Sequence, residues 1–253
     1  MNKLFQTLCV LLTLSSQADA ASTKLYRNID TNKLLPFTQA NRGNTYSQDL
    51  EGLYSIQAFQ SSDIKQPYSE FNQLYQNAIT GQTELEKIAK QIALQSGTST
   101  FSSGVKSKRR AINKITTELA GKNEQITDLA RTSIVAKDVP ALMAAFQLLE
   151  QETQLVRVKN RFKTPGASGY RDLNLLVRLP ESQIIAEVQL HLQAFSVIKN
   201  GKEHYNYEQI QAIERLQLTD NRDLSEIEQA AVNKLRKESQ QLYQQAWNQY
   251  LSA

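Results

Sequence analysis

Two segments of the chain place polar side chains at every second position, which is the spacing of a β-strand with one polar face. Apolar residues fill most of the positions between them. The polar positions are Tyr170, Asp172 and Asn174 in the segment 169–178, and Glu187, Gln189 and His191 in the segment 184–192. A surface sheet has no need of an aromatic ring, a carboxylate and amides gathered on one face. A nucleotide site does.

The residues between these two segments predict that they pair as a β-hairpin. We expect the turn at 179–183, around Pro180 and Glu181. Folding the strands about that turn sets Asn174 near Glu187. It also sets Tyr170 near His191, which we interpret as a neighbour on the strand face and not as a catalyst.

Basic residues recur before the hairpin in two patterns. Lys106, Arg110 and Lys114 have the four-residue spacing that puts side chains on one face of a helix. Such a row suits a polyphosphate, although a basic run is also typical of a solvated face. The second pattern alternates along an extended segment and consists of Arg157, Lys159, Arg161 and Lys163. It either neutralises phosphates or protects an edge strand by charge.

Asp128 lies near the start of a strand predicted over 126–135. Alone, a carboxylate at such a place is often only a turn residue. Together with Glu187 on another strand it could hold Mg²⁺, which prefers one or two carboxylates plus phosphate oxygens and water. Paired acids, flanking cations and an aromatic ring indicate phosphoryl-type transfer, where positioning and charge neutralisation do most of the work.

Hydrophobic periodicity indicates the elements that must position these residues. The sequence predicts one or two helices over 68–95, broken near Gly81, and a loop over 96–104. Further helices are expected over 106–119, 139–152, 206–217 and 224–251, and a short strand over 155–158. This order predicts an α+β or mixed α/β domain, with helices flanking one sheet. The apolar stripe of the last helix is interpreted as core packing.

Composition narrows the class of protein. The 253 residues are 40% hydrophobic, enough for one sizeable core. The net charge of +4 suits an anionic ligand without requiring nucleic acid. Residues 1–20 resemble a secretory signal peptide, with Lys3, a short apolar run and a small-x-small site at 18–20. An uncleaved anchor is the alternative. The single cysteine, Cys9, lies in this run, so a mature chain would hold no disulfide or catalytic thiol.

Four segments, in order across about residues 100–215, resemble the RelA/SpoT-type nucleotidyltransferase domain, and most of all its small alarmone synthetases. Lys106 with Lys114 resembles the basic ATP-binding element, and Asp128 the metal-binding aspartate. The segment 169–174 resembles the acceptor motif Gly-Tyr-Arg-Ser-x-His, and the segment 187–190 the Glu-hydrophobic-Gln-hydrophobic motif with the catalytic glutamate. The chain departs from the family pattern at Gly104, Arg110, Arg131, Asp172 and Asn174.

The resemblance implies a nucleotidyltransferase-like mixed sheet with helical extensions at both ends. It further implies transfer of pyrophosphate from ATP to the 3′-hydroxyl of GDP or GTP, without hydrolase activity. Asp128 and Glu187 would bind Mg²⁺, and Glu187 would be the general base. ATP would contact Lys106, Arg110, Lys114 and Arg131. GDP or GTP would contact Tyr170, Lys163, Arg161, Asn174 and Gln189. His204 resembles a family element near the site.

Two other functions stay open at this point. One is a toxin-like relative that modifies adenosine nucleotides or the 3′ end of tRNA. The other is a non-catalytic nucleotide- or RNA-binding module, which Asp128 and Glu187 disfavour because bare acids repel a polyanion. The expected organisation is a signal peptide over 1–20, a loose leader over 21–65 and one synthetase domain over 66–253. A signal peptide indicates export, whereas ATP and GTP favour the cytoplasm. Self-association is common among the small family members, and no membrane segment is expected in the mature chain.

Overall fold

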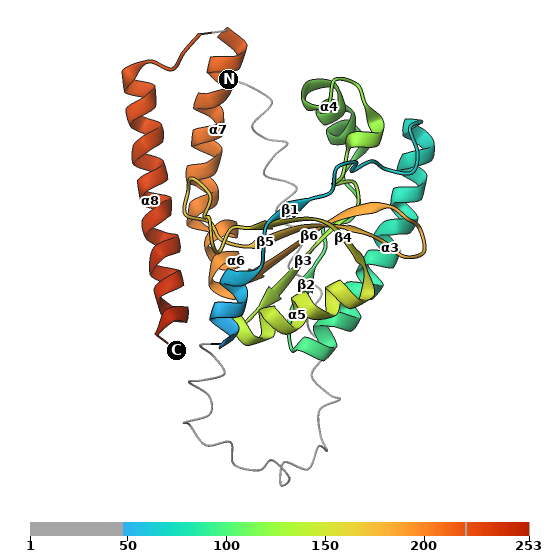
Figure 1. Cartoon of the computed structure of the whole chain (residues 1–253). Helices are drawn as coiled ribbons and strands as arrows, with labels where there is room; N and C mark the ends of the chain where they lie inside the picture. Colours follow the sequence, from blue (N-terminus) through green and yellow to red (C-terminus); the bar gives the residue numbers. More distant parts are fainter. Residues whose placement is uncertain (1–47, 221, 253) are drawn as a thin grey trace, which may run out of the picture. The chain divides into compact units, whose positions relative to one another are not determined.

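The computed structural model describes residues 48–220 and 222–252 and contains one six-stranded mixed sheet in the order β1-β4-β5-β6-β3-β2 (Figure 1). The strands are β1 (Phe59–Gln60), β2 (Ser99–Phe101), β3 (Arg131–Ala136), β4 (Gln154–Asn160), β5 (Leu173–Arg178) and β6 (Ile185–Leu192). The helices are α3 (Phe71–Ser96), α4 (Lys108–Glu118), the 3₁₀ turn η3 (Asn123–Gln125), α5 (Val139–Glu152), α6 (Gln193–Asn200), α7 (Lys202–Asp220) and α8 (Glu226–Leu251). The mixed α+β class predicted from the sequence is confirmed.

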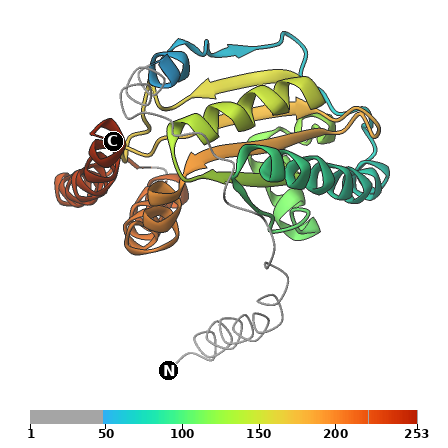
Figure 2. The same cartoon turned by 90° about the horizontal axis from the view of Figure 1, so that it is seen from below.

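One face of the sheet packs against α3 and α5, which lie side by side across it (Figure 2). Both helices begin where a carboxylate caps free N–H groups: Glu70 accepts from the backbone of Asn72 and Gln73, and Asp138 accepts from Ala141. On β6, the side chains that enter this core are completely buried. They are Ala186, Val188, Leu190 and Leu192. The alternate residues of β6 therefore face the other side of the sheet.

The predicted hairpin is formed by β5 and β6. Asn174 pairs with Gln189, and Leu176 pairs with Glu187. β6 also runs parallel to β3, where Arg131 pairs with Glu187 and Val135 with His191. The polar face of the hairpin thus continues onto β3.

A β-bulge in β4 brings part of the basic stripe onto the same face. The register shifts between Leu155 and Arg157, so that Leu155 pairs with Val177 and Arg157 pairs with Leu176. A bulge of this kind changes the direction of the following side chains. Arg157 therefore reaches Asn174, with which it forms a hydrogen bond of 2.8 Å.

The last three helices close one end of the sheet, and α7 and α8 pack against each other (Figure 1). A capping box of Ser225 and Glu228 begins α8. Its apolar stripe packs into an aromatic cluster that holds the loop after β4 against α6. The cluster consists of Phe162, Phe195, Tyr243, Trp247 and Tyr250. The prediction that this stripe is core packing is confirmed.

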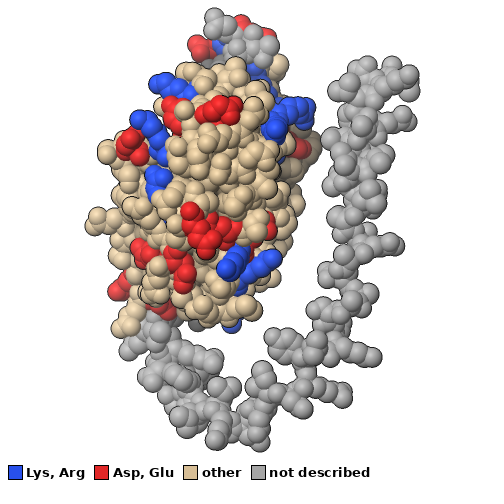
Figure 3. Space-filling view, turned by 90° about the vertical axis from the view of Figure 1, so that its right-hand side faces the viewer, with Lys and Arg blue, Asp and Glu red and all other residues tan. Residues whose placement is uncertain are grey.

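The side of the molecule on which α3 lies shows acidic and basic side chains interspersed among uncharged ones (Figure 3). This surface has no broad field of one sign, which agrees with the small net charge of +4. No helix in the described residues is long and apolar enough to cross a membrane.

The structure differs from the sequence predictions in several elements. Helix α3 is unbroken at Gly81. A Cβ at this position would come within 3.0 Å of Ile184, so the glycine permits close packing and does not end the helix. The segment 96–104 contains β2. The strand predicted from residue 126 begins only at Arg131.

The expected leader over 21–65 ends earlier than predicted. Residues 48–55 are helical, Leu53 in this turn is completely buried, and β1 pairs with β4. The predicted signal peptide over 1–20 and the first part of that leader lie outside the described residues.

Gly169 lies against α8, next to Tyr170, and we predict that position 169 does not tolerate a side chain. Its φ is +82°, and an added Cβ would lie 3.1 Å from the Cα of Gln240. Gly169→Ala should therefore lower the free energy of unfolding by about 1–3 kcal/mol, measured by urea denaturation. Gly166→Ala is the matched control in the same loop, because the nearest atom is 3.8 Å away. Equal stabilities of the two variants would contradict the close approach.

Candidate active site

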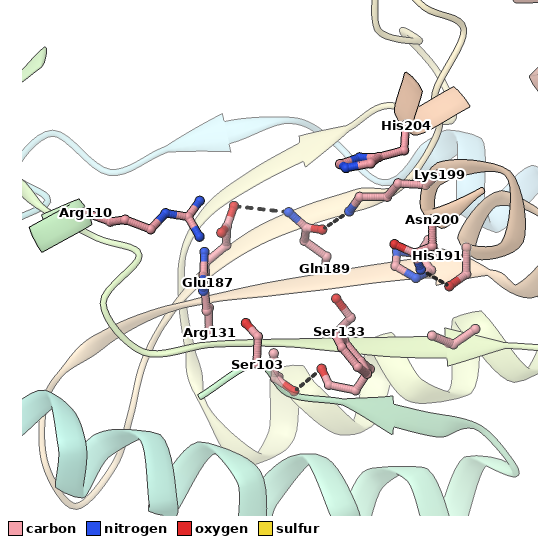
Figure 4. Close-up of a pocket in the computed structure, with 14 residues that line it drawn as sticks. Ser103, Arg110, Arg131, Ser133, Glu187, Gln189, His191, Lys199, Asn200 and His204 are labelled. Carbon is pink, nitrogen blue, oxygen red and sulfur yellow. Dashed lines mark hydrogen bonds between the residues drawn. The ribbon is translucent and has the colours of Figure 1, made fainter. Parts of the chain in front are cut away.

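A pocket of about 670 Å³ opens on the polar face of the sheet and is lined from β2, β3, β6, α4 and the region of α6 and α7 (Figure 4). Its charged and polar lining includes Arg110, Arg131, Glu187, Gln189, His191 and Lys199. Four of these six were predicted as site residues. Glu187, Gln189 and His191 lie on β6, so the second strand of the predicted hairpin supplies a large part of the polar lining.

Glu187 is held in this pocket by side-chain amides. The Nδ2 group of Asn174 donates to Glu187 Oε1 at 2.6 Å, and Gln189 Nε2 donates to the same oxygen at 3.5 Å. Each amide is itself oriented by a cation. Arg157 donates to Asn174 Oδ1 at 2.8 Å, and Lys199 donates to Gln189 Oε1 at 2.9 Å. A chain of hydrogen bonds thus runs from Arg157 to Lys199 through Glu187.

Two guanidinium groups reach toward the carboxylate from other elements: Arg110 extends from α4, and Arg131 from β3 (Figure 4). Gln82 holds the backbone of Arg131 with two hydrogen bonds, of 2.9 and 3.1 Å. Arg131 Nε is buried without a hydrogen-bond partner in the described part of the chain. These cations surround Glu187 with positive charge and leave donors for an anionic ligand.

Asp128 lies in the loop before β3 and is held by two lysines. Lys106 Nζ is 2.5 Å and Lys114 Nζ is 2.9 Å from its Oδ2 atom. Burial alone would raise the pKa of Asp128, but the hydrogen bonds from both lysines outweigh it and lower the pKa. Asp128 Oδ1 is buried and, among the described residues, has no hydrogen-bond partner.

The predicted row of three cations on one helix face is wrong. Lys106 precedes α4, which begins at Lys108 after Ser107, and its backbone N–H donates to Leu129. Lys106 and Lys114 converge on Asp128, whereas Arg110 lines the pocket. The four-residue spacing misled because the chain turns into the helix only after the first cation.

The charges of the two predicted metal-binding carboxylates act on one guanidinium, that of Arg157. Burial lowers the pKa of Arg157, and the charges of Glu187 and Asp128 both oppose that shift. The backbone N–H of Glu187 donates to Ala130, two residues after Asp128. Asp128 itself is not among the residues that line the pocket. No cluster of three or more metal-ligating side chains occurs in the part of the chain that the structure describes.

Behind the pocket, Arg161 and Asp172 form a bidentate ion pair with distances of 2.6 and 2.8 Å. Asp172 is completely buried. Burial raises the pKa of Asp172, and the hydrogen bonds from Arg161 oppose that rise. Because Arg161 is used by this pair, its guanidinium is not presented to the pocket as the sequence predicted.

Tyr170 lies between this ion pair and the pocket. Its hydroxyl is 3.2 Å from His191 Nδ1, as the hairpin predicted, and its ring edge meets Tyr243. Lys199 Nζ and the Arg161 guanidinium lie 5.2 and 5.6 Å from the ring centre. Neither Tyr170 nor Asn174 lines the pocket directly. A base could stack on Tyr170 only beside or in place of these cations.

Lys163 is exposed in the loop after β4 and does not line the pocket. Lys199, by contrast, was missed by the sequence analysis although it bonds Gln189 and faces the pocket. A lysine in the last turn of a short helix is a common C-terminal residue, so no local pattern marks it. His204 also lines the pocket, where the family resemblance placed it near the site.

Comparison with known proteins gives a likeness of fold. No protein-family model and no curated protein matches the chain. The crystal structure of the type VI effector Tas1 with its immunity protein matches with a TM-score of 0.53 and 19% identity, over 69% of this chain and 94% of that chain. This chain has the same fold.

Two further matches are weaker in TM-score. Small alarmone synthetase 2 from Bacillus subtilis is 18% identical with a TM-score of 0.46, over 71% of this chain and 99% of that one. A GTP pyrophosphokinase family protein from Streptococcus pneumoniae is 17% identical with a TM-score of 0.48, over 72% and 93%.

The environment of His191 predicts a pH-dependent stability. Burial, followed by the charge of Lys199, lowers the pKa of His191 from 6.5 to about 4. Between these values the unfolded chain binds more protons than the native one, so the free energy of unfolding falls as the pH is lowered from about 6.5 to about 4. His191→Phe should remove about 2 kcal/mol of the loss between pH 7 and pH 4.5. Urea denaturation at both pH values measures this difference, and parallel losses in both proteins would contradict it.

Proposed function

We propose that this protein transfers pyrophosphate from ATP to the 3′-hydroxyl of GDP or GTP and releases AMP. The observation that carries the proposal is Glu187, a carboxylate oriented by two amides in a pocket whose lining supplies Arg110, Arg131 and Lys199. The order of the four motifs and the fold shared with Tas1 support it.

Glu187 is the general base of the proposed reaction. Asn174 and Gln189 both donate to Oε1, which fixes the plane of the carboxylate for a hydroxyl at the pocket. The carboxylate takes the proton of the 3′-hydroxyl while that oxygen forms a bond to the β-phosphorus of ATP. The bond from the β-phosphorus to the bridging oxygen of the α-phosphate breaks, and AMP leaves with that oxygen.

The cations stabilise the charge that develops on the phosphates. Arg110 and Arg131 border the pocket on the side of Glu187, and Lys199 is held on its other side by Gln189. Preorganised cations of this kind stabilise a transition state without reorganising during the reaction. Lys106 and Lys114 are both paired with Asp128, and each ammonium group keeps further N–H donors beyond that pair.

The carboxylates are suited to Mg²⁺. Asp128 Oδ1 is a buried oxygen without a hydrogen-bond partner in the described chain, and the charges of Asp128 and Glu187 both act on the Arg157 guanidinium. Asp128 and Glu187 would hold the ion, with the remaining ligands from phosphate and water. When bound, Mg²⁺ would neutralise negative charge on the ATP phosphates.

A second candidate keeps this chemistry and changes the acceptor to an adenosine nucleotide or the 3′ end of tRNA. The observation that favours it is the fold shared with Tas1, a type VI effector crystallised with its immunity protein. An exported effector also agrees with the signal-peptide pattern of residues 1–20. Incubation with ATP and either GDP, GTP, ADP or tRNA, followed by identification of the product, separates the two candidates.

The role of Glu187 predicts that Glu187→Gln lowers AMP production from ATP and GDP with Mg²⁺ by about 100-fold or more. The substitution keeps the shape of the side chain and removes the base. Glu238→Gln, an exposed carboxylate on α8, is the control and should retain full activity. Retained activity in a folded Glu187→Gln protein would overturn the assignment.

A further inference from the structure

His191 carries a buried polar atom that nothing in the described chain satisfies. Its side chain lines the pocket, the residue is only 3% exposed, and its Nε2 atom has no hydrogen-bond partner. A buried polar atom without a partner is costly. Because the residue lines the pocket, a bound molecule that reaches Nε2 can supply the missing partner.

The neighbours of His191 determine which kind of partner Nε2 takes. Both carboxylate oxygens of Asp172 accept from Arg161, and the negative charge of Asp172 acts on Tyr170 and favours its protonated hydroxyl. In this arrangement the Tyr170 proton points to Asp172. The hydroxyl oxygen then accepts the proton on His191 Nδ1, which lies 3.2 Å away. The imidazole is neutral near pH 7, because burial and Lys199 lower its pKa to about 4. Nε2 is therefore an acceptor.

The position of His191 along β6 indicates which part of a nucleotide it meets. His191 lies four residues after Glu187 on the same face of the strand, about 13 Å away. With the ribose hydroxyl and phosphates near Glu187 and its arginines, a nucleotide that fills the pocket extends toward His191 with its base.

We propose that His191 Nε2 accepts a hydrogen bond from the exocyclic amino group of a purine base, and so determines which purine nucleotides the pocket selects. Guanine and adenine both present such a group, at position 2 and position 6 respectively. The proposal rests on the proposed function in taking the ligand to be a nucleotide whose ribose and phosphates lie near Glu187. Arg161, Asp172 and Tyr170 are positioning residues that set the tautomer.

The tautomer can be observed directly, because the chain has only two histidines. In full-length protein labelled with ¹⁵N-histidine, NMR should show one imidazole with its proton on Nδ1, an assignment that His191→Phe confirms by removing the signal. The Nε2 resonance of this ring should shift when a purine nucleotide is added. Tyr170→Phe should abolish the fixed tautomer. A proton on Nε2 in the unliganded protein would overturn the proposal.

Selectivity is tested by binding, without requiring transfer. Isothermal titration compares GDP with inosine diphosphate, which lacks the 2-amino group, and ATP with purine riboside triphosphate, which lacks the 6-amino group. The wild type should bind the amino-bearing member of one pair about tenfold more tightly. The pair that responds shows whether guanine or adenine lies against His191.

The same titrations with His191→Phe should reduce that preference to about twofold or less, while the fold, checked by thermal unfolding, is kept. Tyr205→Phe, at an exposed residue of α7 that is not part of the pocket lining, is the control and should retain the preference. A preference that survives in His191→Phe, or its absence in both pairs for the wild type, would overturn the inference. A His191-dependent preference in a protein that produces no AMP would instead refute the proposed function and leave the inference standing.

Discussion

The arrangement of the candidate site depends on the burial of one side of β6. Val188, Leu190 and Leu192 are completely buried against the core that includes α3 and α5, and each such side chain contributes about 1.5–3 kcal/mol. Because successive side chains of a strand point to opposite faces, a slip of one residue would expose all three. The same constraint fixes Glu187, Gln189 and His191 on the opposite face. The hydrophobic core thus determines which polar groups meet the pocket.

The polar side of the sheet is organised by pairing each carboxylate with its own set of partners. Asn174 and Gln189 orient Glu187, Arg161 neutralises Asp172, and two lysines hold Asp128. Each of the three acids therefore has hydrogen-bond partners of its own. Glu187 differs from the other two in being held by neutral amides in an open pocket, which suits a base better than a carboxylate in an ion pair does.

Much of this arrangement followed from local sequence pattern. Period-two alternation predicted the hairpin, the contact of Tyr170 with His191 and the proximity of Asn174 to Glu187. The ends of α5 followed from its periodicity. The separation of Lys106 from Arg110 did not, because it depends on a chain turn before α4 that leaves no mark in the spacing of cations. Arg157 reaches Asn174 through a bulge, and Lys199 reaches Gln189 through the packing of α6, and both are tertiary effects. Gly81 resembles a helix breaker in sequence, and only the position of Ile184 explains it.

The proposed reaction moves both terminal phosphates of ATP together, which distinguishes this protein from an ordinary kinase or ATPase that uses the same kind of cationic pocket. The most direct measurement follows ATP labelled at its β-phosphorus, incubated with the full-length protein, Mg²⁺ and GDP, GTP or ADP. We expect the label on the acceptor nucleotide, in an amount equal to the AMP released. Label that remains on ADP, with only the γ-phosphate transferred or hydrolysed, would contradict it.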